Sequence, residues 1–136
     1  MADIRKLTDN LSVAPQISIE DVAQIAAAGF KAVMVNRPDG EEPGQVATAD
    51  IEKAVTDAGM EFHNLPVVSG QMTPDHIARY GQVLSSAPAP LLAYCRTGTR
   101  STLLWAMSQA GTVPGEQLIE TAANAGYDIS ALAGRI

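Results

Sequence analysis

The only cysteine of the chain lies in a short segment whose residues could do chemistry. Cys95 is followed by two arginines, Arg96 and Arg100, and by Gly98. A cysteine attacks as its thiolate, and nearby positive groups lower the thiol pKa from about 8.5 to roughly 3.5–7.5. The segment therefore predicts a reactive thiolate beside a bound anion, suited to attack on a sulfane sulfur or on phosphorus.

The backbone after Cys95 adds a second reason to expect anion binding. N–H groups at a helix start lack partners within the helix, and successive N–H groups in a turn form a concave nest. Gly98 lets the loop turn tightly, and the Arg100 guanidinium can contact an oxyanion through two N–H groups. We expect Cys95 and Arg100 to be catalytic. The expected anion-binding residues are Arg96, Thr97, Gly98, Thr99 and Ser101. The alternative is an inert core cysteine in a structural turn.

Composition narrows the class of protein. The 136 residues are 46% hydrophobic and 18% charged, which predicts one globular domain over residues 1–136. A net charge of -6 argues against nucleic acid or an anionic membrane as partner. One cysteine excludes an internal disulfide, and the two histidines lack metal-ligand spacing, so we expect no metal. Without a signal-like start or an apolar run of about 20 residues, we expect a soluble cytoplasmic protein.

Short apolar runs alternate with helical patterns, which is typical of an α/β fold with a mainly parallel sheet. Strands are expected over residues 11–17, 30–35, 60–65 and 91–94. Helices are expected from Ser18, from Thr48 or Asp50 to Ala58, from Thr73 to about Ser85, from Ser101, and from about Pro114 to Ala125. Cys95 would then join the end of a strand to the start of a helix.

The segment from Cys95 to Ser101 resembles the active-site loop of rhodanese-type sulfurtransferases, commonly Cys-Arg-x-Gly-x-Arg-Ser. Over nearly its whole length the chain resembles the beta-lactamase-hydrolase-like, phosphatase-like domain family. The segments that carry this resemblance include residues 19–22, 29–33, 36–44, 65–67, 91–105 and 125–128. It implies a fold similar to dual-specificity phosphatases, with helices on both sides of a largely parallel sheet.

The two resemblances imply different reactions. Enzymes similar to tyrosine phosphatases use Cys-x5-Arg, usually after a histidine, whereas here four residues separate Cys95 from Arg100 and Tyr94 precedes the cysteine. A shorter loop should surround a tetrahedral phosphate less completely, so we expect sulfur transfer. Cys95 would take sulfur from thiosulfate or a persulfide and pass it to a thiol, with no metal or organic cofactor. The family resemblance also implies a sulfide-oxidising enzyme as a partner, in sulfide detoxification.

Two alternatives stay open. One is a phosphatase that hydrolyses phosphoesters through a Cys95 phosphocysteine; the other is a non-catalytic domain that binds an anion or a partner. A phosphatase also needs a general acid. Asp75 is the nearest upstream candidate, although its place at a helix start explains it equally well. In the loop of residues 37–44, we expect Asp39, Glu41 and Glu42 to form a solvated turn. Arg37 is either a surface cation or a residue that reaches the site.

Overall fold

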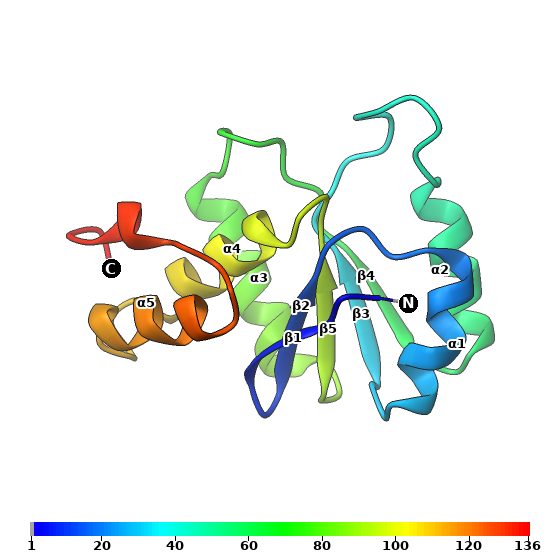
Figure 1. Ribbon diagram of the computed structural model, residues 1–136, viewed down its shortest axis with the longest axis horizontal. Helices are drawn as coiled ribbons and strands as arrows, with labels where there is room; N and C mark the ends of the chain where they lie inside the picture. The colour runs from blue at the N-terminus through cyan, green and yellow to red at the C-terminus, as the bar shows by residue number, and fades with distance from the viewer. Residues whose placement is uncertain (1) are drawn as a thin grey trace.

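A five-stranded sheet forms the centre of the protein (Figure 1), in a computed structural model that describes residues 2–136. The strands are β1 (Arg5–Thr8), β2 (Leu11–Ala14), β3 (Ala32–Val35), β4 (Glu61–Asn64) and β5 (Leu91–Tyr94), in the spatial order β1-β2-β5-β3-β4. Strand β1 runs antiparallel to β2, and all other neighbours are parallel. The predicted mainly parallel sheet is confirmed.

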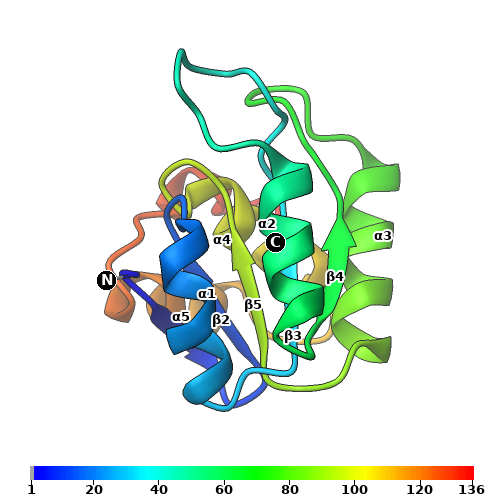
Figure 2. The same cartoon turned by 90° about the vertical axis from the view of Figure 1, so that its right-hand side faces the viewer.

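Helices cover both faces of the sheet. On one face lie α1 (Ile19–Ala27) and α2 (Thr48–Asp57), which stand in front of the sheet in Figure 2. On the other lie α3 (Pro74–Ser86), α4 (Thr99–Gln109) and α5 (Gly115–Asn124), followed by a short 3-10 helix over Ser130–Leu132. None of the helices within residues 2–136 combines the length and apolar character that crossing a bilayer requires.

Alternate side chains of the central strands enter two separate cores. In β3, Val33 and Val35 face the α1 and α2 side, whereas Ala32 and Met34 face α3 and α4. Strand β5 divides its side chains in the same way, and every residue of both strands is buried. Burial on both faces explains why these strands read as continuous apolar runs in the sequence.

The helix starts follow from local capping. The Ser18 hydroxyl accepts the Asp21 N–H at 3.1 Å and the Asp21 carboxylate accepts the Ser18 N–H at 2.9 Å, a reciprocal cap that confirms the predicted start of α1. Helix α4 instead begins at Thr99, two residues before the predicted Ser101. The loop after Cys95 is therefore shorter than expected, and Arg100 lies in the first turn of the helix.

The carboxyl ends of four parallel strands meet at one edge of the sheet, the upper edge in Figure 1. Cys95 follows β5, the central strand, directly. Arg37 lies two residues after the end of β3. Gln16 lies two residues after β2, and Val67 lies three residues after β4. Ligand sites of open α/β sheets lie at this edge. The four segments that follow these strands are therefore the expected location of a ligand site.

Candidate active site

Cys95 is fixed at the base of its loop. Its N–H donates to the Ala14 carbonyl at 3.3 Å, which extends the pairing of β5 with β2 by one residue. Its Sγ accepts the Gly98 N–H at 3.1 Å. The residue has no exposed surface, so its sulfur is closed to solvent in this structure.

Arg100 lies beside this sulfur and has one side of its guanidinium occupied. Nη1 donates to Glu41 Oε2 at 2.8 Å and to the Val67 carbonyl at 2.9 Å, while Nη2 donates to Glu41 Oε1 at 2.9 Å. The hydrogen bond to Glu41, and then the nearby Cys95 sulfur, raise the pKa of Arg100. A guanidinium has five N–H groups. Glu41 and Val67 accept three of them, and the Cys95 side chain is a further hydrogen-bond partner of Arg100.

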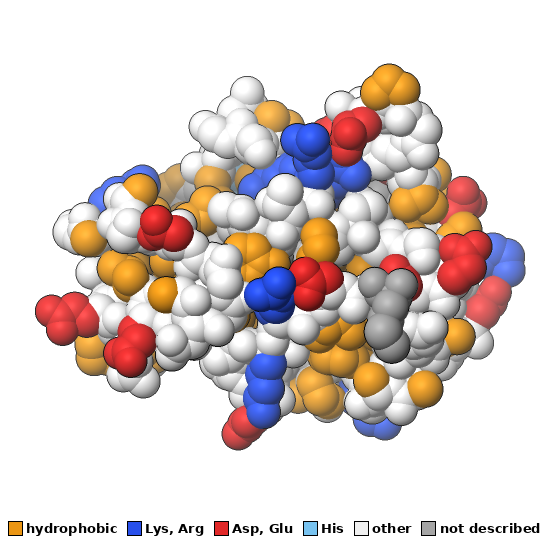
Figure 3. Space-filling view, in the orientation of Figure 1, with side chains coloured by type: hydrophobic (Ala, Val, Ile, Leu, Met, Phe, Trp, Pro, Cys, Tyr) orange, Lys and Arg blue, Asp and Glu red, His pale blue; other side chains and the backbone are white. Residues whose placement is uncertain are grey.

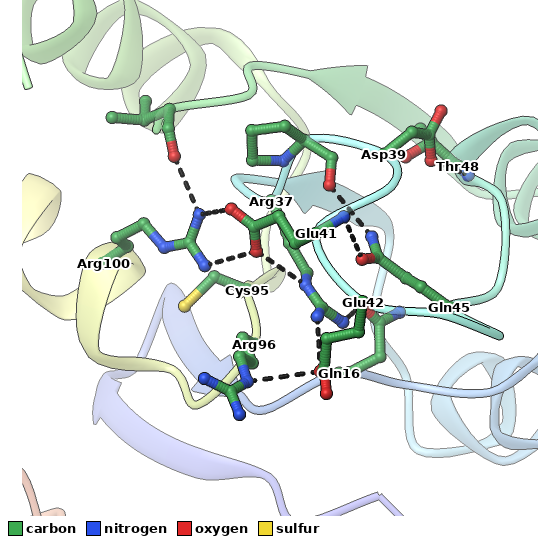
Figure 4. Close-up of polar contacts among 12 residues, drawn as sticks. Gln16, Arg37, Asp39, Glu41, Glu42, Gln45, Thr48, Cys95, Arg96 and Arg100 are labelled. Atoms are coloured by element: carbon green, nitrogen blue, oxygen red, sulfur yellow. Dashed lines mark hydrogen bonds and ion pairs between the residues drawn. The ribbon is translucent and has the colours of Figure 1, made fainter. Parts of the chain in front are cut away.

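Glu41 joins Arg100 to a second arginine (Figure 4). Its Oε1 also accepts the Nε of Arg37 at 2.8 Å, and the Arg37 side chain is only 3% exposed. Hydrogen bonding from Arg100, and secondarily from Arg37, lowers the pKa of Glu41 to about 2. Glu41 is therefore ionised at neutral pH. Of the two interpretations of Arg37, the structure supports the one in which it reaches the site.

Glu42 and Arg96 form the outer part of the same network. Glu42 Oε1 accepts from Arg37 Nη2 at 2.6 Å and forms an ion pair with Arg96 Nε at 3.2 Å. Figure 3 shows basic side chains gathered at this end of the molecule. The cavity above the loop, about 310 Å³, is lined by Glu41, Glu42, Ser69, Arg96 and Arg100. The Arg96 side chain is 60% exposed, so its ion pair is weak and is the easiest of these contacts to open.

Residues 39–44 form an exposed turn, as expected. What the expectation missed is that the carboxylates of Glu41 and Glu42 both pair with arginines of the site. Asp39 instead accepts the Thr48 N–H at 2.7 Å, where α2 begins. Asp75 lies in the first turn of α3, where its side chain is 76% exposed. It does not line the cavity above the loop.

The remaining predicted anion-binding residues divide into two groups. Thr97 on the loop and Thr99 at the first position of α4 are exposed, with a 3.1 Å hydrogen bond between their hydroxyls. Ser101 is buried, and its hydroxyl donates to Asn36 Oδ1 at 2.7 Å, which ties α4 to the segment after β3. Its hydroxyl is thus engaged away from the mouth of the site, and its part in anion binding stays a prediction.

Gly98 is held in a conformation that requires glycine. Its φ is +93°, and a Cβ there would overlap the hydroxyl of Tyr127. Tyr127 comes from the segment after α5 and donates its O–H to the Thr97 carbonyl at 3.1 Å. Burial, and then the charge of Cys95, raise the pKa of this tyrosine, so it stays neutral and keeps its proton for the hydrogen bond.

Sequence reasoning missed Glu41 and Tyr127 as residues of the site. Glu41 is 59 residues from Arg100 in the chain, and Tyr127 is 30 residues from Thr97. The available signal for Glu41 was its place soon after a parallel strand, on the edge that also carries Cys95. Tyr127 gave no chemical signal, since one tyrosine after a helix fits many structural roles.

Tyr94, which precedes the cysteine, does not take the place of a catalytic histidine. Its side chain belongs to the buried cluster on the α1 and α2 side, where burial raises the pKa of its hydroxyl. The two histidines lie elsewhere: His63 contacts Glu61 on β4, and His76 caps α3 with Thr73. No group of three or more metal-ligating side chains occurs among residues 2–136. The need for no cofactor stays a prediction.

Comparison with known proteins places this geometry in a family context. Residues 3–112 match the family described as beta-lactamase hydrolase-like protein, phosphatase-like domain. A beta-lactamase hydrolase-like protein of Agrobacterium fabrum is 31% identical over 128 residues, 93% of this chain but 30% of the relative. The chain thus spans under a third of that protein.

Solved structures share the fold. A Neisseria meningitidis protein described as a candidate phosphatase is 36% identical, with a TM-score of 0.89 over 98% of this chain and 95% of that one. P. aeruginosa TpbA, solved in complex with pTyr, is 16% identical with a TM-score of 0.69, over 93% of this chain and 75% of that one. The second likeness concerns the fold alone.

Proposed function

Because the chain belongs to the phosphatase-like domain family of beta-lactamase hydrolase-like proteins, we propose that it is a cysteine-dependent phosphatase for phosphate monoesters. One observation carries the proposal: the Cys95 sulfur accepts a loop N–H and lies beside Arg100, on N–H groups that Glu41 and Val67 do not use. The pTyr complex of TpbA, a protein with the same fold, agrees with a small anionic ester as substrate. Sulfur transfer, favoured by the sequence, has no support from these relatives and becomes the second candidate.

The proposed reaction has two displacements at phosphorus. The Cys95 thiolate attacks phosphorus, the S–P bond forms, and the ester P–O bond breaks with its electron pair going to the leaving oxygen. Water then attacks the phosphocysteine, which releases inorganic phosphate and restores the thiolate. Arg100 and the amides at the start of α4 stabilise the phosphoryl oxygens in both steps.

The leaving oxygen receives little help from a protein acid. The carboxyls that line the cavity above the loop are Glu41 and Glu42, and both have lowered pKa values because arginines hydrogen-bond to them. Neither holds a proton at neutral pH. Esters whose leaving group departs readily as an anion, such as aryl phosphates, are therefore the expected substrates.

The test is phosphate release from phenyl phosphate by the wild type and by Cys95→Ser. We expect release only from the wild type, together with a phosphate adduct on Cys95 after rapid acid quenching, measured by intact mass. Ser108→Ala is the matched control, because Ser108 lies on α4 with its hydroxyl bonded to the Trp105 carbonyl, away from the loop. Release that persists in Cys95→Ser would refute the proposal.

Sulfur transfer rests on a different observation, the spacing of four residues between Cys95 and Arg100. In that reaction the thiolate attacks the outer sulfur of thiosulfate, a new S–S bond forms, and sulfite leaves with the electron pair of the old one. Incubation with thiosulfate would add one sulfur to Cys95, removable by reductant. This adduct, without phosphate release from any aryl ester, would reverse the ranking. A sulfide-oxidising partner belongs to this second candidate.

A further inference from the structure

A groove that is polar at the Arg100 end and apolar farther along runs beside α4. It begins in a cavity of about 200 Å³ with a mixed lining. Arg96, Arg100, Ser69, Thr97 and Thr99 stand there next to Val68, Met72 and Leu103. It continues into a second cavity of about 360 Å³, which shares Met72 and Leu103 and extends to Ile77, Met107 and Leu132. Because the two cavities share lining residues, we treat them as one feature, called here the α4 groove.

The side chains of the α4 groove keep apolar surface in contact with water. Val68, at the end next to the arginines, is 48% exposed, and Met72, Ile77, Leu103 and Met107 are half-buried. Of the residues lining the larger cavity, only Arg135 is charged. Such a lining gains from contact with an apolar group and offers few hydrogen bonds to a sugar or a peptide. Methionines also adapt their shape to what they contact.

The cationic end and the apolar body of the groove together define a ligand. Building on the phosphatase function proposed above, we propose that the α4 groove binds the apolar part of the substrate, an elongated alkylaryl group whose phosphate lies at Arg100. The two features fit one molecule, since the cavity that contains Arg96 and Arg100 also contains the first apolar residues of the groove. An aryl leaving group agrees with the lack of a protonated carboxyl at the mouth.

The test uses phenyl phosphates with para-alkyl chains from methyl to hexyl. These phenols leave with nearly equal ease, so their rates report contact with the chain. We expect kcat/KM to rise by up to about fourfold for each added methylene until the groove is filled, the ratio that burial of one CH2 group gives. In Leu103→Gln we expect kcat/KM to increase less with each added methylene.

Leu84→Gln is the matched control. Leu84 is a half-buried leucine on α3 that packs against the same core, but it lines a separate cavity with Thr8 and Gln109. We expect this variant to keep the dependence on chain length. Thermal unfolding of both variants shows whether they fold to the same extent.

A binding measurement separates failure of the groove from failure of the phosphatase function. Alkylphosphonates of increasing length are titrated into Cys95→Ser by calorimetry, which requires no turnover. Affinity that rises with chain length, and loses that rise when Leu103→Gln is added, supports the groove even if no ester is hydrolysed. Cys95-dependent hydrolysis with rates and affinities independent of chain length would overturn the groove and leave the phosphatase proposal intact.

Discussion

The carboxylate of Glu41 spans the two Nη atoms of Arg100, at 2.8 and 2.9 Å, in a side-chain pair that joins segments 59 residues apart. The contact uses the two Nη atoms and not Nε, and Cys95 is a further side-chain partner of Arg100. Glu41 therefore holds Arg100 in place without filling the anion site. Because Arg37 donates to the same carboxylate, the ionised Glu41 holds both Arg37 and Arg100 in place.

Removing the charge of Glu41 should impair catalysis through Arg100. Loss of a charge-assisted hydrogen bond is worth roughly 1.5–3 kcal/mol, so we expect kcat/KM of Glu41→Gln to fall about 10- to 100-fold. Glu42→Gln, a change of the same kind in a half-exposed residue without contact to Arg100, should lose less. For both variants, we would measure the steady-state rate with phenyl phosphate and the affinity for inorganic phosphate by calorimetry. Tighter phosphate binding by Glu41→Gln would mean that Glu41 blocks the anion site.

The same carboxylate should make stability depend on pH in acid. The folded-state pKa of Glu41, about 2, lies below the ordinary value of 4.5, because Arg100 hydrogen-bonds to the ionised form. Proton binding thus favours the unfolded chain, and the contribution of Glu41 is complete above pH 4.5 and is lost as the pH falls toward 2.

Urea unfolding of wild type and Glu41→Gln across this range isolates the effect, since all other carboxyls are common to both proteins. The difference between their unfolding free energies should shrink as the pH falls. A difference that stays constant would contradict the assignment of this pKa to Glu41.

Gly98→Ala should lower the stability of the protein by more than the cost of placing an alanine at a positive φ. An alanine at positive φ costs about 1–2 kcal/mol, and the added methyl group would also overlap the Tyr127 hydroxyl. Gly111→Ala has a similar φ of +86° with nothing within 4 Å of the new Cβ, so it should show the backbone cost alone. Thermal and urea unfolding compare the two. Equal losses of stability in the two variants would show that the Tyr127 side chain moves away from the new methyl group without a cost in free energy.

Removal of the hydroxyls of two tyrosines should change the free energy of unfolding in opposite directions. The hydroxyl of Tyr80, on α3, is fully buried and has no hydrogen-bond partner among residues 2–136, so Tyr80→Phe should raise the free energy of unfolding by about 1 kcal/mol. Tyr127→Phe removes the bond to the Thr97 carbonyl and should lower it by about 0.5–1.5 kcal/mol. Equal destabilisation by both would contradict the unsatisfied state of Tyr80.

Local sequence was enough to predict most of the elements. The strand over 91–94 and the starts of α1 and α3 were predicted correctly, because apolar runs and capping residues act over a few positions. Strand β1 was missed because it is an edge strand with one buried side chain, Leu7, and so lacks the alternation that marks a strand. The start of α4 was placed two residues late, since a glycine at positive φ ended the loop sooner.

What the sequence alone determined is the chemical content of the loop: one thiol, a glycine and two arginines within seven residues, after a buried strand. Only the tertiary structure decided how those groups are used. The parallel sheet brings the ends of β3 and β5 together, which places Glu41 on Arg100, and the turn after α5 lays Tyr127 over Gly98. Such partners come from distant segments, and their pairing depends on strand order and helix packing, which no local pattern encodes.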